Sequence, residues 1–121
     1  MPKGHRLYKK KCFNPRKEFQ GTTKELARYA KALAHPARIK ILRFLSHSDF
    51  CYTGDFVEVL PMAQSTVSQH LKELKNAGLI IAKEQPPRVS YCINHQVWER
   101  AKALFHDFFA ALSDPHEENI Q

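Results

Sequence analysis

The fold is most clearly predicted by one segment, which reads Ala63-Gln-Ser-Thr-Val-Ser-Gln-His-Leu-Lys-Glu-Leu-Lys-Asn-Ala-Gly-Leu79. Val67, Leu71 and Leu74 recur at i, i+4 and i+7, which places them on one apolar face of a helix over residues 64–77. Gly78 follows, and glycine readily takes the left-handed conformation that ends many helices. The remaining faces are polar, with a single acid. This pattern suits either a helix that enters a DNA major groove or an ordinary amphipathic surface helix.

Helical patterns also precede this segment. The residue before a proline avoids the helical region, and proline is favoured in a first turn, so His35-Pro36 marks a junction between two helices. We expect a first helix capped at Thr22 or Thr23, a second over Ala37–Ser46 with Pro36 in its first turn, a loop over Ser48–Thr53, and a short third helix over Asp55–Leu60.

After Gly78 the apolar period changes from helical to two, which is typical of strands. We expect strands over Leu79–Lys83 and Val89–Ile93, joined by a tip over Glu84–Arg88. A short helix, a tight turn, a polar helix and a hairpin make a winged helix-turn-helix. The predicted fold is therefore mostly α with a small β-hairpin, in the order helix-helix-helix-helix-strand-strand-helix.

A last helix is expected to begin near Asn94 or His95. Its apolar side chains recur at a spacing of three to four residues over two heptads. So many large aromatics exceed what the core of a small domain needs, which indicates a partner surface and a homodimer. The residues expected at this interface are Trp98, Ala101, Phe105, Phe108 and Leu112.

Charge divides the 121 residues unevenly. Residues 1–20 hold seven Lys and Arg against one Glu, which accounts for most of the net charge of +7. A basic arm beside a nearly neutral body favours a polyanionic partner such as nucleic acid, although a solubilising tail has the same composition. We expect a flexible arm over 1–20, a DNA-binding and dimerisation domain over 21–112, and a polar tail over 113–121.

Several classes of protein are disfavoured. The chain has no apolar run long enough for a signal peptide or a membrane span, so we expect a cytoplasmic protein without a membrane partner. Three cysteines are too few for a disulfide framework. No phosphate-binding glycine loop or nucleophile elbow is present, so we do not expect an enzyme. A winged-helix module for protein or RNA binding is the remaining rival to DNA binding.

Two segments, Ala32-Leu-Ala-His-Pro-Ala-Arg-Ile-Lys-Ile-Leu42 and Gln64–Ile80, are similar to motifs of a known family. The first resembles the second-helix signature of the ArsR/SmtB metal-sensing repressors, and the second resembles their recognition helix. Tyr91-Cys-Ile-Asn94 resembles the end of their second wing strand. The resemblance covers about Leu26 to Leu112. It implies a homodimeric repressor that sits on an inverted-repeat operator of double-stranded DNA and leaves it when a ligand binds.

The resemblance also implies which residues contact DNA. By position, the residues expected to face bases or phosphates are Gln64, Ser65, Thr66, Ser68, Gln69 and His70, with Arg88 on the wing reaching the backbone or the minor groove. The polar pattern of the helix itself adds two cations farther along it, Lys72 and Lys75. The wing tip departs from the family, because Pro86-Pro87 stands where a glycine turn is common.

The ligand sites of the family transfer poorly. Tyr52 and Gly54 stand at the positions of its Cys-x-Cys pair, and of its last-helix zinc ligands only His95 has a matching donor. Some relatives hold arsenite or soft divalent metals between an N-terminal cysteine of one subunit and a third-helix cysteine of the other. The cysteines that would fill these roles are Cys12 and Cys51, with Cys92 as a third ligand or a bystander. A thiol redox or sulfur-species switch and purely structural cysteines are the alternatives.

Overall fold

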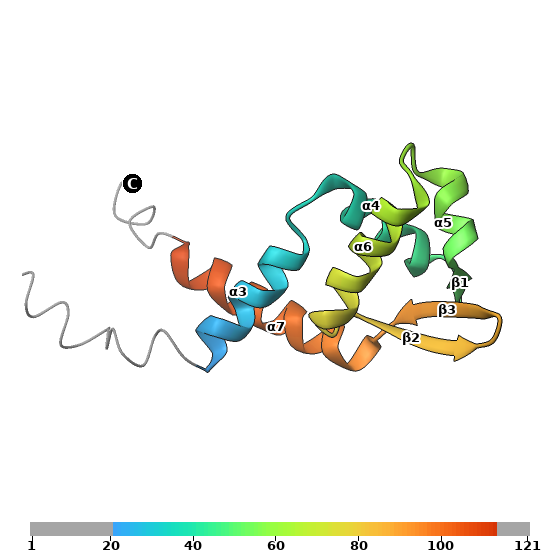
Figure 1. Cartoon of the computed structure of the whole chain (residues 1–121). Coiled ribbons are helices and arrows are strands. Elements are labelled where there is room, and N and C mark those ends of the chain that lie inside the picture. The colour runs from blue at the N-terminus through green and yellow to red at the C-terminus, as the bar shows by residue number, and fades with distance from the viewer. Residues whose placement is uncertain (1–20, 114–121) are drawn as a thin grey trace, which may run out of the picture.

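The computed structural model of the protein describes residues 21–113. Its elements run in the order α3 (Thr22–Ala32), α4 (Pro36–Ser46), β1 (Cys51–Tyr52), α5 (Thr53–Val59), α6 (Gln64–Asn76), β2 (Ile80–Gln85), β3 (Arg88–Ile93) and α7 (His95–Leu112). Figure 1 shows α3 lying along α7 at one end of the molecule and the sheet at the other. The predicted arm over 1–20 and most of the predicted tail lie outside the described residues. No described helix is both long and apolar enough to cross a membrane.

The predicted helices are confirmed, with small shifts at their ends. The junction before α4 forms as expected: Pro36 is its first residue, and His35 Nδ1 accepts a hydrogen bond from the Ala37 N–H at 3.0 Å. The N-cap of α3 is Gly21, with φ +63°, so the prediction of a threonine cap was wrong. Likewise, α5 begins at Thr53 rather than at Asp55.

The sheet has one strand more than expected. Cys51 and Tyr52 were expected in a loop but form β1, which pairs antiparallel with β3 and gives the strand order β1-β3-β2. The β2–β3 pairing extends to Gln85 and Arg88, so the tip consists of two residues rather than five. Proline lacks a backbone N–H but still fits the loop positions, where no ladder bond is needed.

The core lies between α4, α5, α6 and the base of the hairpin. The largest side chains that are almost fully enclosed are Ile41, Leu45, Phe56, Val67, Leu71, Leu74, Leu79 and Ile80. All three predicted stripe residues of α6 are at 0% exposure. Burying each such side chain contributes roughly 1.5–3 kcal/mol relative to leaving it in water. This packing fixes α6 to the domain and leaves its polar side facing outward.

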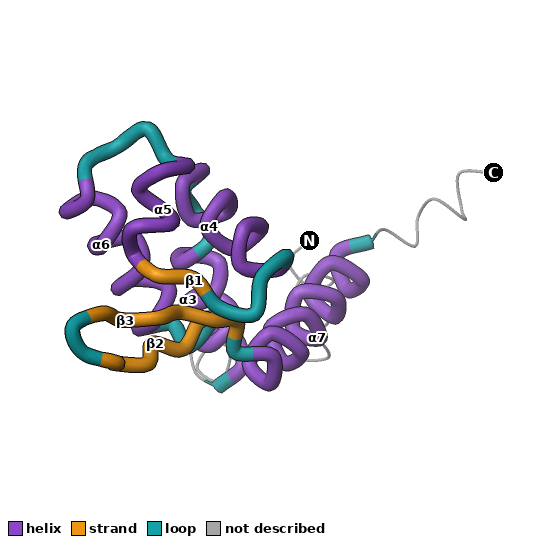
Figure 2. Tube along the Cα trace, turned by 90° about the vertical axis from the view of Figure 1, so that its right-hand side faces the viewer, coloured by secondary structure: helices purple, strands orange, loops and turns teal. Residues whose placement is uncertain are grey.

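The interface predicted on α7 divides into two parts. Ala101 is at 0% exposure, and Trp98 and Phe105 are partly buried against the core of their own chain, so the part of these three residues in a dimer interface stays a prediction. Exposed apolar side chains occur farther along the helix, where Phe108, Phe109 and Leu112 are 44%, 61% and 66% exposed. Figure 2 shows α7 extending away from the sheet toward the C-terminus. We call Phe108, Phe109 and Leu112 the α7 patch.

Candidate nucleic-acid interface

The polar face of α6 is open to solvent. Seven of the side chains predicted to contact DNA are exposed on it: Gln64, Ser65, Thr66, Ser68, Gln69, Lys72 and Lys75. They are hydrogen-bond donors and acceptors or cations, the groups that contact base edges and phosphates. The only acid of the helix, Glu73, accepts a hydrogen bond from the Gln69 Nε2 at 3.1 Å. The solvent-exposed side of the helix is therefore polar and contains few acids.

Residues 60–63 connect α5 to α6, and these two helices pack against each other. Phe56, the one fully buried side chain of α5, stands edge-on to the rings of Phe44 and Tyr91. The α6 helix ends at Asn76, and Gly78, two residues later, has φ +86°, the left-handed conformation that was predicted; the chain then turns directly into β2. The hairpin is thereby fixed beside the polar helix, as in a helix-turn-helix followed by a wing.

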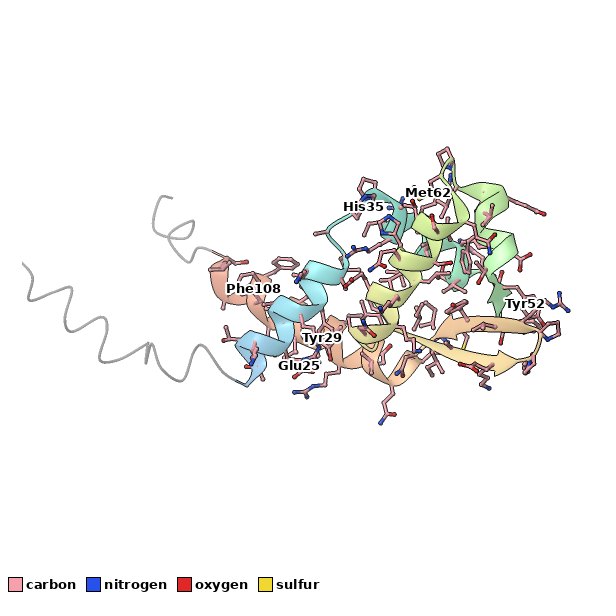
Figure 3. The ribbon with its side chains drawn as sticks, viewed as in Figure 1. Glu25, Tyr29, His35, Tyr52, Met62 and Phe108 are labelled. Carbon is pink, nitrogen blue, oxygen red and sulfur yellow. The ribbon has the colours of Figure 1, made fainter. Side chains whose placement is uncertain are left out.

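His70 departs from the DNA-facing prediction. It is only 7% exposed, and its Nδ1 accepts a hydrogen bond from Arg38 Nε at 3.1 Å. Its ring lies 4.2 Å from that of His35, which is labelled in Figure 3. Burial, followed by the nearby His35 and Arg38, lowers the pKa of His70. His70 therefore joins α6 to α4 instead of facing DNA.

Arg38 is a residue that the sequence reasoning missed. Besides its bond to His70, its Nη1 donates to the backbone oxygens of Lys31 and Ala32 at 3.3 and 3.4 Å. One guanidinium thus satisfies carbonyls at the end of α3 and fixes a side chain of α6. No motif marks this role, because it depends on how three helices meet.

The guanidinium of the exposed wing arginine lies over an aromatic ring. The Cζ of Arg88 lies 4.2 Å from the centroid of the Tyr52 ring, within the range of a cation–π contact. Tyr52 belongs to β1 and lies at the hairpin end of the molecule (Figure 3). The sequence reasoning considered Tyr52 only as a missing metal ligand, because β1 was not predicted.

The cysteines do not form a complete metal site in the described part of the chain. Cys51 is 4% exposed, and burial raises the pKa of its thiol, which disfavours the thiolate that binds metals. Cys51 faces Tyr91 across the β1–β3 pair, so the neighbouring Cys92 side chain points to the other side of the sheet. Within residues 21–113 no three His, Cys, Asp or Glu side chains are grouped to hold a metal. Cys12 lies outside the described residues.

Comparisons with known proteins agree with this geometry. The family model for bacterial regulatory proteins of the arsR family matches residues 35–82, from the cap of α4 into β2. The chain is 30% identical to the HTH-type transcriptional regulator YgaV of Escherichia coli (strain K12) over 79 residues, which are 65% of this chain and 80% of that protein. It is 33% identical to an arsenical resistance operon repressor of Staphylococcus xylosus, over 60% of this chain and 69% of the repressor.

Among solved structures, the fold is similar to that of a homodimeric winged helix-turn-helix DNA-binding domain from Mycobacterium bovis, described as a possible ArsR-family transcriptional regulator. The TM-score is 0.58 at 28% identity, and the match covers 77% of this chain and 85% of that domain. The sequence and the backbone thus lead to the same group of proteins.

Proposed function

Because this chain belongs to the ArsR family of bacterial regulatory proteins, we propose that it represses transcription as a homodimer whose two α6 helices read an inverted-repeat operator. Its relatives are transcriptional regulators rather than enzymes, and the chain is a winged helix-turn-helix protein of that kind. Three parts of this function are proposals: the operator, the role of α6 as the helix that reads it, and the inducer.

The exposed face of α6 is the observation that carries this proposal. Major grooves admit an α-helix, and each well-made base contact there contributes about 1–3 kcal/mol of discrimination against a wrong base. Ser68 and Gln69 are exposed on the helix opposite its buried stripe, where they are available to bases. Lys72 and Lys75 follow on the same helix and suit phosphates, which supply affinity without sequence preference.

The α7 patch supports the dimeric part of the proposal. Three large apolar side chains are exposed on neighbouring turns of one helix, and an exposed apolar patch of this kind often marks a protein–protein interface. A two-fold axis through such a patch relates two copies of the same surface. It also relates two copies of α6, which is why a dimer of this kind reads an inverted repeat.

Selection of DNA from a random-sequence pool tests this function. Purified protein is used to enrich 30-base-pair duplexes, and the bound pool is sequenced. We expect an inverted repeat whose half-sites are about 10 base pairs apart or a multiple of that spacing. A pool without any enriched sequence, or one with a single half-site bound by a monomer, would contradict the proposal.

Release by a thiophilic ligand stays a prediction. It is motivated by Cys12 and Cys51 and by the arsenical resistance repressor among the relatives. The burial of Cys51 speaks against a preformed thiolate there, so a site would require the segment that contains Cys12. Arsenite, cadmium, zinc and peroxide are titrated into the complex with the selected duplex. If Cys12→Ser and Cys51→Ser variants both dissociate at wild-type ligand concentrations, the cysteines are structural.

A further inference from the structure

The contact between Tyr52 and Arg88 is fixed from both sides. In the β1–β3 register Tyr52 faces Ser90, so Arg88, two residues earlier on β3, is its diagonal neighbour on the same face. The Tyr52 N–H donates to Asp55 Oδ2 at 2.8 Å, which holds the start of α5 against β1. The ring of Phe50 stands edge-on to the Tyr52 ring, 5.6 Å between centroids. The tyrosine is therefore a rigid support for a long, exposed arginine.

This pair forms one side of a cleft between the wing and the reading helix. The cleft has a volume of about 260 Å³, and the first residue of α6 also lines it. Its lining includes Tyr52, Thr53, Gly54, Gln64, Pro87 and Arg88. No acid lines it, and Arg88 is its one charged group. A Cβ added at Gly54 would meet nothing within 4 Å, so the cleft is open at that point.

The geometry of duplex DNA assigns an occupant to such a cleft. A sugar-phosphate strand separates each major groove from the next minor groove. When a helix enters the major groove and a hairpin tip approaches the neighbouring minor groove, that sugar-phosphate strand passes between the helix and the hairpin. The cleft lies between the first residue of α6 and the wing, and its charge is of the sign that a phosphate requires.

We propose that this cleft holds one backbone phosphate of the operator, with Arg88 as its charged donor and Tyr52 as the positioning residue that fixes the guanidinium there. The inference rests on the proposed function, because it presumes that α6 lies in the adjacent major groove. A guanidinium stacked on a ring keeps its N–H groups in its own plane, so Arg88 donates to a phosphate without leaving Tyr52. Ordering the side chain before binding also reduces the entropy lost on DNA binding.

The first test removes the charge. Affinity for the selected duplex and for a random duplex is measured by fluorescence anisotropy over a range of salt concentrations. We expect Arg88→Gln to weaken both complexes by roughly tenfold and to reduce the slope of log K against log salt by about one. Lys83→Gln, an exposed wing cation outside the cleft, is the matched control and should leave the slope nearly unchanged.

The second test removes the support. We expect Tyr52→Leu to weaken binding about two- to fivefold, as loss of an exposed cation–π contact implies, whereas Tyr52→Phe keeps the ring and the affinity. The decisive comparison is a double-mutant cycle. In an Arg88→Gln background, Tyr52→Leu should have no further effect on binding, whereas a merely structural tyrosine would cost the same in both backgrounds.

Three results would overturn the inference: an unchanged salt slope in Arg88→Gln, additive effects of the two substitutions, or tighter binding by Tyr52→Leu. Arg88 is exposed, so its variant remains informative even if the Tyr52→Leu protein does not fold. If the wild-type protein binds no DNA at all, the proposed function itself fails. If the wild type binds DNA and the Arg88 and Tyr52 variants bind with the same affinity and salt slope, the proposed phosphate cleft is wrong while the proposed function still holds.

Discussion

The side chain of His70 links α6 to α4 through its hydrogen bond with Arg38. Its Nδ1 can accept the hydrogen bond from Arg38 only while that nitrogen is unprotonated. Burial is the main cause that holds its pKa below the ordinary value of 6.5, and His35 and Arg38 add to it, while Glu73 opposes them. The unfolded chain therefore binds more protons at this position than the folded one between the two pKa values.

We expect this histidine to make the protein less stable in mild acid. Because the unfolded state binds the extra proton, the free energy of unfolding decreases as the pH falls below 6.5. Urea unfolding at pH 7.5 and 5.5 measures the change. His70→Gln should show a smaller decrease, and His106→Gln, which replaces an exposed histidine on α7, should match the wild type. Equal decreases in all three proteins would contradict this assignment.

The inward position of His70 could have been predicted from the sequence. It lies three residues after Val67 and four before Leu74, which places it on the buried face of the same helix. His70 was instead predicted to face DNA because histidine is polar, although its spacing from Val67 and Leu74 places it on the buried face. Tyr52 and Arg38 are different, because their partners lie on other elements and become neighbours only through the tertiary structure.

At the scale of elements, one ion pair joins α3 to α7. Glu25 accepts hydrogen bonds from Arg100 Nε and Nη2, the second at 2.7 Å, and a further one from the Tyr29 hydroxyl at 2.7 Å. Figure 3 labels Glu25 and Tyr29 on α3. The Arg100 and Tyr29 bonds lower the pKa of Glu25 to about 2. The carboxylate therefore contributes stability above its ordinary pKa of 4.5, and this is lost as the pH falls through 2.

A Glu25→Gln variant tests this connection. We expect it to be less stable than the wild type at pH 7 and to lose less stability between pH 4.5 and pH 2. Thermal unfolding followed by circular dichroism provides the comparison. Glu99→Gln removes an acid of the exposed pair with Lys102, in which both side chains are more than 70% exposed, and should behave as the wild type. A Glu25→Gln curve that follows the wild type at every pH would disprove the coupling.

Elements with a regular pattern were predictable, and elements defined by pairing were not. The helices α4 and α6 carry their own signals, namely a proline junction and an apolar stripe that ends at Gly78. A two-residue strand such as β1 has no period to detect, since only its pairing with β3 makes it a strand. The aromatic stripe of α7 runs continuously along the sequence. The sequence therefore does not show which of these side chains pack against the core and which are exposed to solvent.

Reading of an inverted repeat by the whole molecule requires two copies joined so that both α6 helices face DNA. We expect the α7 patch to form part of that interface, and a Phe108 buried there would contribute roughly 1.5–3 kcal/mol per copy. Phe108→Asp should therefore shift the protein toward monomer in sedimentation velocity and abolish operator binding at the same time. Ala103→Asp, an exposed change on the same helix, is the control. A dimeric Phe108→Asp protein would exclude the patch from the interface.

Whether α6 reads bases is tested by one comparison of affinities. Binding of the selected duplex and of a random duplex is measured for the wild type, Gln69→Ala and Gln96→Ala, the last being the same change at an exposed position on α7. We expect Gln69→Ala to cost about 1–3 kcal/mol on the selected duplex and clearly less on the random one, while Gln96→Ala changes neither. Equal losses on both duplexes, or no loss on either, would contradict it.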